Sequence, residues 1–408
     1  LNYAENLLRS PDDSLAIEEF REDGFSDELT RKELKNRTLK MAGWLKSKGI
    51  KKGDRVCAYM PNCSETIITM LATSALGAIF SSCSSDFGVE GVIDRFEQIE
   101  PKILVAANGY LYNGKLIDRV EEIKTISKRL TSLEHILIVE YVISPKDIDS
   151  FPNFNSVFQS DPIEKYILCD FNDPLYIVFS SGTTGKPKCI VHSIGGVLIQ
   201  HAKEHLLHTN LIEKEKMFYF TTCGWMMWNW LVGSLFCRSS IILYEGSPFY
   251  PNPEHLWEIA EKSDLNIFGT SAKYIDALSK SEIDPMRQFK LGKLRTICST
   301  GSPLSPDGYD YILSNIKSDV QIASISGGTD LLSCFVLSNP IGAVIKGEIQ
   351  CRALGMNVDI FDENKESLVD QEGELVCKTA FPSMPIKFWN DKNGKKYKEA
   401  YFEKFAGV

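Results

Sequence analysis

The chain has 408 residues, 43% hydrophobic and 24% charged, a composition typical of a globular protein of roughly two to four domains. Its formal charge of −9 argues against a nucleic-acid-binding protein, which usually carries a basic face. The eleven cysteines form no Cys-x-x-Cys pair, which indicates reduced thiols in a cytosolic protein. No signal-peptide pattern opens the chain. The longest weakly polar run, Thr66 to Phe80, is too short to predict a membrane span and is interpreted as a buried helix.

Apolar runs and helical periods alternate along the first third of the chain. This alternation predicts α/β layers with mainly parallel sheets, and residues 1–165 are expected to form a first subdomain. The turn-rich stretch 145–162 is interpreted as a connection. The predicted strands are Leu15–Phe20, Asp54–Met60, Lys102–Ala106 and His135–Val139, and the predicted helices cover 29–48, 63–76, 89–99 and 114–130.

A loop of small and hydroxylated residues follows the predicted strand Leu175–Phe179, and a second strand begins at Cys189. Gly182 and Gly185 permit backbone angles that turn successive N–H groups into one hollow. Hydroxyl donors and positive charge come from Ser180, Ser181, Thr183, Thr184, Lys186 and Lys188. Such a hollow suits a polyphosphate, although a plain hairpin turn with solvated lysines is the alternative. The spacing is not that of a Walker loop, because Gly182 and Gly185 are too close.

A predicted helix from Gly195 to Leu211 carries His201, His205 and His208. The first two histidines lie four residues apart and could share a metal ion. No Glu precedes the second histidine as in a zinc-protease helix, so solvated helix histidines are the preferred interpretation.

Small-residue loops also follow later predicted strands, and residues 166–343 are expected to form a second α/β subdomain. Strand Leu294–Cys298 runs into a loop at 299–304, and strand Val320–Ile325 runs into another at 326–330. Open α/β sheets bind ligands at the carboxyl ends of their strands, so these loops predict a nucleotide crevice. The segment Cys223–Trp230 is rich in Trp and Met, which usually indicates core packing.

Helical periodicity stops at Val344. Short strands parted by turns then predict a small β-barrel or curled sheet over 344–408, with a charged and aromatic end that lacks a closing element.

The run Ser-Ser-Gly-Thr-Thr-Gly-Lys-Pro-Lys, residues 180–188, resembles the phosphate-loop signature of the adenylate-forming superfamily. That superfamily contains acyl-CoA synthetases, luciferases and peptide-synthetase adenylation domains. The resemblance spans nearly the whole chain and is closest to the acetoacetyl-CoA synthetase branch. It implies ATP, Mg²⁺ and coenzyme A as cofactors or co-substrates, and an acyl-adenylate formed from acetoacetate without a protein nucleophile.

The resemblance also implies roles for individual residues. The catalytic candidates are Thr184, Lys188 and Asp330, and Asp330 is also the magnesium ligand. The acyl pocket is expected from Trp225, Met226, Met227 and Gly327. The nucleotide is expected to contact the phosphate loop together with Gly301, Ser302, Pro303, Ser326, Gly327, Gly328 and Thr329.

Two positions depart from the wider superfamily. Asp330 stands where a longer Glu is more common, which changes the reach to a metal ion. Gly327 stands where acetyl-CoA synthetases have a Trp, so the missing indole is expected to open space for a four-carbon acid.

The superfamily's ribose-binding Asp and catalytic Lys are expected beyond Val408, and its lead segment before Leu1. The chain as given is therefore expected to turn over little or nothing by itself. Another short-chain acyl-CoA synthetase, or a non-catalytic nucleotide-binding remnant, are the alternatives. Small-molecule substrates are the expected partners.

Overall fold

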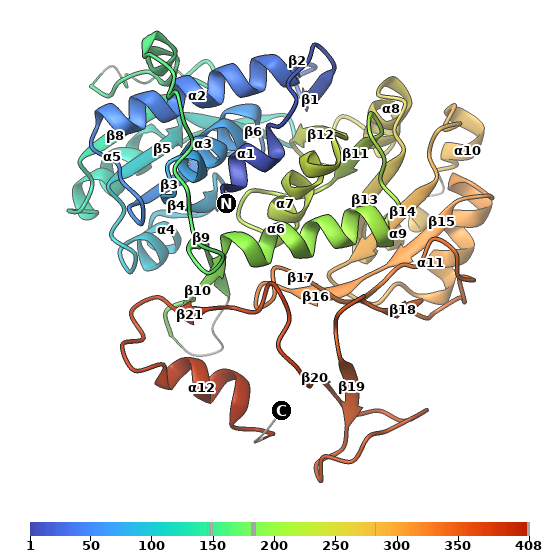
Figure 1. Ribbon diagram of the computed structural model, residues 1–408. Helices are drawn as coiled ribbons and strands as arrows, with labels where there is room; N and C mark the ends of the chain where they lie inside the picture. Colours follow the sequence, from blue (N-terminus) through green and yellow to red (C-terminus); the bar gives the residue numbers. More distant parts are fainter. Residues whose placement is uncertain (145, 147, 149, 181–184, 282, 406–408) are drawn as a thin grey trace.

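The computed structural model describes residues 1–144, 146, 148, 150–180, 185–281 and 283–405 (Figure 1). Within these residues the chain forms two large sheets with helices between and outside them, which confirms the predicted mixed α/β class.

The first large sheet has seven strands and is parallel except at one edge, where β9 and β21 both pair antiparallel with β10. In spatial order its strands are β21 (Lys387–Phe388), β10 (Lys188–Ser193), β9 (Pro174–Ser180), β4 (Ile79–Ser84), β3 (Arg55–Met60), β5 (Ile103–Ala107) and β8 (His135–Val139). The interior strand β3, between β4 and β5, is buried on both faces from Val56 to Met60, as expected of a parallel strand covered by helices on both sides.

The second large sheet also has seven strands, and only its edge pair β1–β2 is antiparallel. In spatial order its strands are β15 (Gln321–Ser324), β14 (Thr296–Thr300), β13 (Ile267–Ser271), β11 (Lys216–Tyr219), β12 (Ser240–Glu245), β1 (Leu15–Arg21) and β2 (Ser26–Thr30).

The two sheets do not follow the sequence boundary expected near residue 165. Strands β1 and β2 come from the first 30 residues but belong to the second sheet. Strands β9 and β10 lie beyond residue 165 but belong to the first. Strand pairing depends on long-range register, which a boundary drawn from local composition does not contain.

The largest apolar core is shared by both sheets, with α3, α6 and α7 packed within it. Separate cores lie under α8, α9 and α11 on the second sheet and under α4 and α5 on the first. The α-helices are α1 (Tyr3–Leu7), α2 (Arg31–Ser47), α3 (Ser64–Ala75), α4 (Val89–Phe96), α5 (Val120–Arg129), α6 (Ile194–Lys203), α7 (Met226–Gly233), α8 (His255–Lys262), α9 (Ala272–Lys280), α10 (Pro285–Gln288), α11 (Pro306–Tyr311) and α12 (Lys395–Phe402).

Shorter helical turns complete the fold. Two are 3₁₀ turns, η1 (Phe154–Gln159) and η3 (Ser234–Cys237), and two are π-helical, η2 (Glu204–His208) and η4 (Ile312–Ile316). A hairpin of β6 (Gly109–Tyr112) and β7 (Lys115–Asp118) extends from the first sheet.

Local sequence explains where several helices begin. Helix α2 starts with a capping box in which Thr30 and Glu33 satisfy each other's backbone N–H groups. The Ser193 hydroxyl accepts from Gly196 N at the start of α6. The run expected to be a buried helix around Thr66 is α3, whose residues are almost all buried. Across the described residues, no helix combines the length and apolar character needed to cross a membrane.

The region after Val344 differs from the expected β-barrel. Its strand β18 (Cys351–Arg352) completes an open three-stranded sheet with two earlier strands, β16 (Ser326–Gly328) and β17 (Ser333–Leu337). Strands β19 (Val358–Phe361) and β20 (Glu374–Cys377) form a two-stranded ribbon, and β21 joins the first large sheet. The aromatic end forms helix α12, where we expected no element. Asp391 accepts from the N–H groups of Lys396 and Tyr397 at its start, and Tyr397 and Tyr401 share one face.

Candidate functional site

The predicted phosphate loop connects β9 and β10, which form an antiparallel hairpin. Its flanking residues Ser180 and Lys188 pair directly across the two strands, so the strand–loop–strand prediction is confirmed. The candidates Ser181, Gly182, Thr183 and Thr184 lie outside the described residues. At the loop's edges, the buried Ser180 hydroxyl has no hydrogen-bond partner among described atoms, and Gly185 has φ +110°.

The two lysines of this loop point to different surroundings. Lys186 Nζ lies 3.1 Å from the carboxylate of Glu97 on the surface. Lys188 Nζ lies 5.7 Å from the centre of the Phe388 ring, which belongs to the neighbouring strand β21.

The two predicted adenine loops lie side by side at the carboxyl ends of β14 and β15. These strands are parallel neighbours, and Ser299 pairs with Ser324. Ile325 N donates to Ser299 O at 2.9 Å, and the Thr300 hydroxyl donates to Ile325 O at 2.8 Å. Gly301–Pro303 and Ser326–Thr329 therefore leave the sheet together, as the strand-end rule predicts.

A cavity of about 80 Å³ brings the predicted acyl residues against these loops. Trp225 precedes α7 as its N-cap, and Met226 and Met227 open that helix. The cavity is lined by all three together with Thr300, Gly301, Ile325, Gly327, Gly328, Thr329, Ser333 and Cys334. A smaller hollow on the β4 and β9 side shares Trp225, Met226 and Thr329 with it. The site thus lies where the two sheets meet.

Gly327 lines this cavity, but in this structure the absence of its side chain does not open the space that we expected for a four-carbon acid. A Cβ at Gly327 would lie 2.0 Å from Ser333 O and 2.6 Å from Cys334 Cα, so it would run into β17 rather than the cavity. At Gly328 no described atom lies within 4 Å of the added Cβ. The open space therefore belongs to Gly328, because neighbouring residues of an extended strand point to opposite sides.

Asp330 follows β16, and its carboxylate accepts a hydrogen bond from the Tyr401 hydroxyl at 2.6 Å. Tyr401 lies on α12, 71 residues further along the chain, and no local sequence signal connects the two. The pKa of the Tyr401 hydroxyl is raised by burial and by the nearby Asp330 charge, so this hydroxyl keeps its proton and donates it in the hydrogen bond. In the described residues no group of three His, Cys, Asp or Glu side chains could hold a metal ion.

The histidines of the predicted helix are not solvated, which corrects our expectation. His201, His205 and His208 are all buried, and their neighbours are backbone carbonyls rather than metal-ligand partners. Burial lowers the pKa of His205 to about 3 and also lowers the pKa of His201, so both rings are neutral. The helix faces the core on this side, which its mixed polar and apolar pattern did not reveal.

His192 on β10 is a further residue that sequence reasoning missed. Its two ring nitrogens lie 3.0 Å from Thr329 O and 3.0 Å from Ser383 O. It therefore joins the hairpin of the phosphate loop to the segment between β16 and β17, which carries the candidate metal ligand Asp330.

The arrangement combines a hydroxyl- and glycine-rich loop, two strand-end loops and the cavity lined by Trp225–Met227. Asp330 lines a separate pocket together with Tyr401. The model of the AMP-binding enzyme family matches residues 4–384, and the chain belongs to that family.

Similar proteins and a similar solved structure carry one name. The chain is 48% identical to the acetoacetyl-coenzyme A synthetase of Rhizobium meliloti (strain 1021) and 45% identical to the acetoacetyl-CoA synthetase of Mus musculus, over all of its own length. It covers 63% and 62% of those two proteins. The acetoacetyl-CoA synthetase structure from Streptomyces lividans superposes with a TM-score of 0.95 at 38% identity, covering 100% of this chain and 64% of that one.

Proposed function

We propose that the full-length protein is an acid–thiol ligase that activates acetoacetate with ATP and transfers it to coenzyme A. The observation that supports this most is the cavity at the sheet junction, in which the Trp225–Met227 wall faces both strand-end loops. Similarity to acetoacetyl-CoA synthetases over the whole chain supports the same substrate.

In the proposed first step, an oxygen of the acid's carboxylate attacks the α-phosphorus of ATP and the bond to the β,γ-pyrophosphate breaks. Lys188 and the phosphate loop would supply donors and positive charge that stabilise the charge on the leaving pyrophosphate. In the second step the thiol of coenzyme A attacks the acyl carbon, loses its proton, and releases AMP.

Asp330 is the residue we propose for Mg²⁺. A single carboxylate fits this ion, which keeps several waters and takes its other oxygens from phosphates. When bound, Mg²⁺ would neutralise charge on the phosphates. The chain's own part is to hold the Asp330 carboxylate directly after Thr329, which lines the cavity, and the 2.6 Å hydrogen bond from Tyr401 orients that carboxylate.

We also propose that the protein works in the cytosol. All eleven cysteines are free thiols, and nine are buried, which fits a reducing compartment.

The test is acid-dependent exchange of labelled pyrophosphate into ATP, followed by formation of the CoA thioester, with the full-length protein. Acetoacetate should give the highest kcat/KM in a panel that includes acetate, propionate and butyrate. A higher value for another acid would replace the substrate but keep the reaction. ATP binding without exchange for any acid would instead support a nucleotide-binding role without catalysis.

A further inference from the structure

The buried polar face of α6 and η2 is not explained by the motifs of the site. Gln200, His201, Glu204, His205 and His208 are each at most 3% exposed. Ionisable groups at such positions are unfavourable unless they are paired and hydrogen-bonded. Their partners therefore indicate what the face is for.

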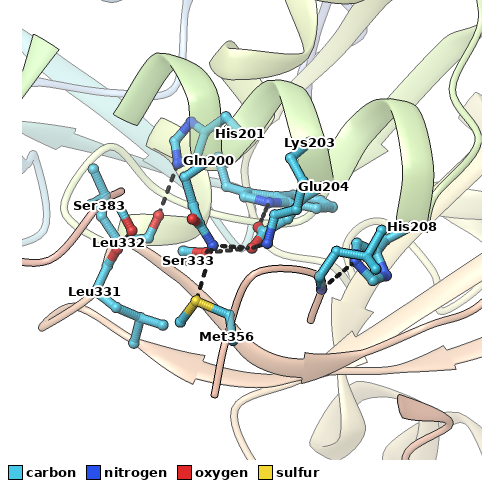
Figure 2. A network of polar contacts seen from close by, with 12 residues as sticks. Gln200, His201, Lys203, Glu204, His208, Leu331, Leu332, Ser333, Met356 and Ser383 are labelled. Atoms are coloured by element: carbon cyan, nitrogen blue, oxygen red, sulfur yellow. Dashed lines mark hydrogen bonds and ion pairs between the residues drawn. The ribbon is translucent and has the colours of Figure 1, made fainter. Parts of the chain in front are cut away.

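Glu204 is the centre of this face (Figure 2). One carboxylate oxygen accepts from the Ser333 hydroxyl and from Gln200 Nε2 at 2.9 Å, with Lys203 Nζ 3.4 Å away. The other accepts from Trp230 Nε1 at 2.8 Å. Burial raises the pKa of Glu204, but the Lys203 charge and these hydrogen bonds outweigh it and hold the pKa below its ordinary value. The group is an ionised carboxylate with both oxygens satisfied.

Two hydrogen-bond partners of Glu204, Trp230 and Ser333, belong to two different elements that contribute residues to the cavity lining. Trp230 belongs to α7, the helix that opens with Met226 and Met227. Ser333 begins β17 and lines the cavity beside Gly327. Glu204 thus connects the proposed acyl wall to the strand on the nucleotide side through two direct hydrogen bonds.

The same face also holds the turn between Asp330 and β17. His201 Nε2 lies 2.8 Å from Leu332 O, and Leu332 has φ +51° although it is not glycine. Such a conformation is strained for a branched side chain and persists only where neighbouring groups impose it. On the opposite side of this turn the Ser383 hydroxyl donates to Leu331 O at 2.6 Å.

Helix α7 has a glycine, Gly233, where it packs against His201. A Cβ at Gly233 would lie 2.4 Å from His201 Nδ1, so only glycine lets the two helices approach with the imidazole between them. His205 Nε2 adds a contact of 2.8 Å to Trp230 O on the same helix.

We propose that Glu204, supported by Gln200 and His201, is a positioning residue that sets the separation of the two cavity walls and the place of Asp330. This inference rests on the proposed function for its effect on catalysis, but its structural part does not. A misplacement of about 1 Å in such a site can lower the rate about a hundredfold.

The test compares Glu204→Gln and Ser333→Ala with His208→Gln in the full-length protein. The glutamine cannot accept on both sides. Its NH₂ group would face either the donor Trp230 Nε1 or, on the Ser333 side, the donors Gln200 Nε2 and Lys203 Nζ. Ser333→Ala removes one partner and leaves the charge in place. His208 is the matched control: it is equally buried on the same helix but contacts Ser338 O and Leu354 N, at the far end of β17. Five residues of strand separate the two contacts by about 17 Å.

Two measurements are made on each variant: amide hydrogen exchange, and pyrophosphate exchange with separate KM values for acid and ATP. We expect Glu204→Gln and Ser333→Ala to speed hydrogen exchange at least tenfold in residues 329–334. They should lower kcat/KM for the acid 10- to 100-fold, while the KM for ATP changes less than threefold. His208→Gln should speed exchange near 338 and 354 and leave kcat/KM near wild type.

Unchanged hydrogen exchange at 329–334 in both variants would overturn the proposal whatever the activity. Equal loss of kcat/KM in Glu204→Gln and His208→Gln, at equal thermal stability, would also overturn it, since the effect would then be general destabilisation. If the wild-type protein activates no acid, the proposed function fails, and hydrogen exchange alone decides whether Glu204 places the segment.

Discussion

Gly327 and Gly328 are adjacent but differ in what a side chain would meet: β17 at Gly327 and open space at Gly328. We expect Gly328→Val to place its methyl groups in the cavity and to lower kcat/KM for acetoacetate about tenfold or more, relative to acetate. A group the size of a methylene changes such ratios by roughly 1–3 kcal/mol. The measurement is the ratio of kcat/KM for the two acids.

Gly327→Ala is the contrasting variant. Its Cβ would meet the β17 backbone 2.0 Å away, so we expect a lower melting temperature, from overpacking of roughly 1–3 kcal/mol. If Gly327→Ala were stable and shifted the acid preference while Gly328→Val did not, the assignment of the open space to Gly328 would be wrong.

Because Tyr401 donates a hydrogen bond to Asp330, the proposed magnesium ligand, we expect a substitution at Tyr401 to weaken the response to Mg²⁺. Tyr401→Phe keeps the ring, whose centre lies 5.0 Å from that of Tyr397 and 5.4 Å from that of Phe388, so the fold should be retained. Loss of a second partner of a metal-binding carboxylate typically weakens metal binding 10- to 100-fold. We expect the Mg²⁺ concentration for half-maximal exchange to rise about tenfold.

Binding of Mn²⁺ in the presence of ATP, followed by electron paramagnetic resonance, gives a readout independent of turnover. Equal Mn²⁺ affinity in wild type and Tyr401→Phe would show that the contact does not support the metal site.

At the scale of elements, the hairpin of β9 and β10 holds the ends of the proposed phosphate loop in one place. The Ser180–Lys188 pair fixes both ends, so substitutions within the loop should act on catalysis rather than on folding. We expect Thr184→Val, nearly isosteric, to lower the rate of pyrophosphate exchange about a hundredfold, the cost of losing one aligned donor, about 3 kcal/mol. Its melting temperature should stay close to wild type. Gly182→Val should have at least as large an effect, and near wild-type exchange in both variants would contradict the assignment of the loop.

At the scale of the whole molecule, two glutamates of the second sheet hydrogen-bond the start of α3, the helix that follows β3 of the first sheet. Glu245, the last residue of β12, accepts from Asn62 N at 2.7 Å, and Glu19 of β1 accepts from Ser64 N at 2.8 Å. Both N–H groups lie at the beginning of α3, so these contacts join the two sheets across their interface.

Glu245 makes this junction sensitive to pH. Burial raises its pKa to about 7, from its usual 4.5. Between pH 4.5 and pH 7 the folded state binds more protons at Glu245 than the unfolded state does. The contribution of Glu245 to stability is therefore complete below pH 4.5 and is lost as the pH rises through 7. Between pH 4.5 and pH 7 we expect this titration to lower the free energy of unfolding of the wild type by up to about 3 kcal/mol. Glu245→Gln lacks the titrating group, so its free energy of unfolding should not show this loss. Urea unfolding at pH 5 and pH 7.5 measures the difference, and equal pH dependence in both proteins would contradict it.

The sequence alone determined the α/β class, the strand-end loops and their adjacency, because each depends on local periodicity and on the rule that parallel strands end at one edge. The family resemblance also assigned Trp225–Met227 and Gly327 to one pocket, and these residues line one cavity in the structure. The tertiary structure decided what depends on contacts between distant segments: that β1 and β2 join the second sheet, that the α6 histidines are buried, that Tyr401 reaches Asp330, and that Gly328 rather than Gly327 faces open space. Burial and side-chain direction at these positions follow from what packs against them. Partners such as Tyr401 for Asp330, 71 positions away, and Leu332 for His201, 131 positions away, leave no local signal in the chain.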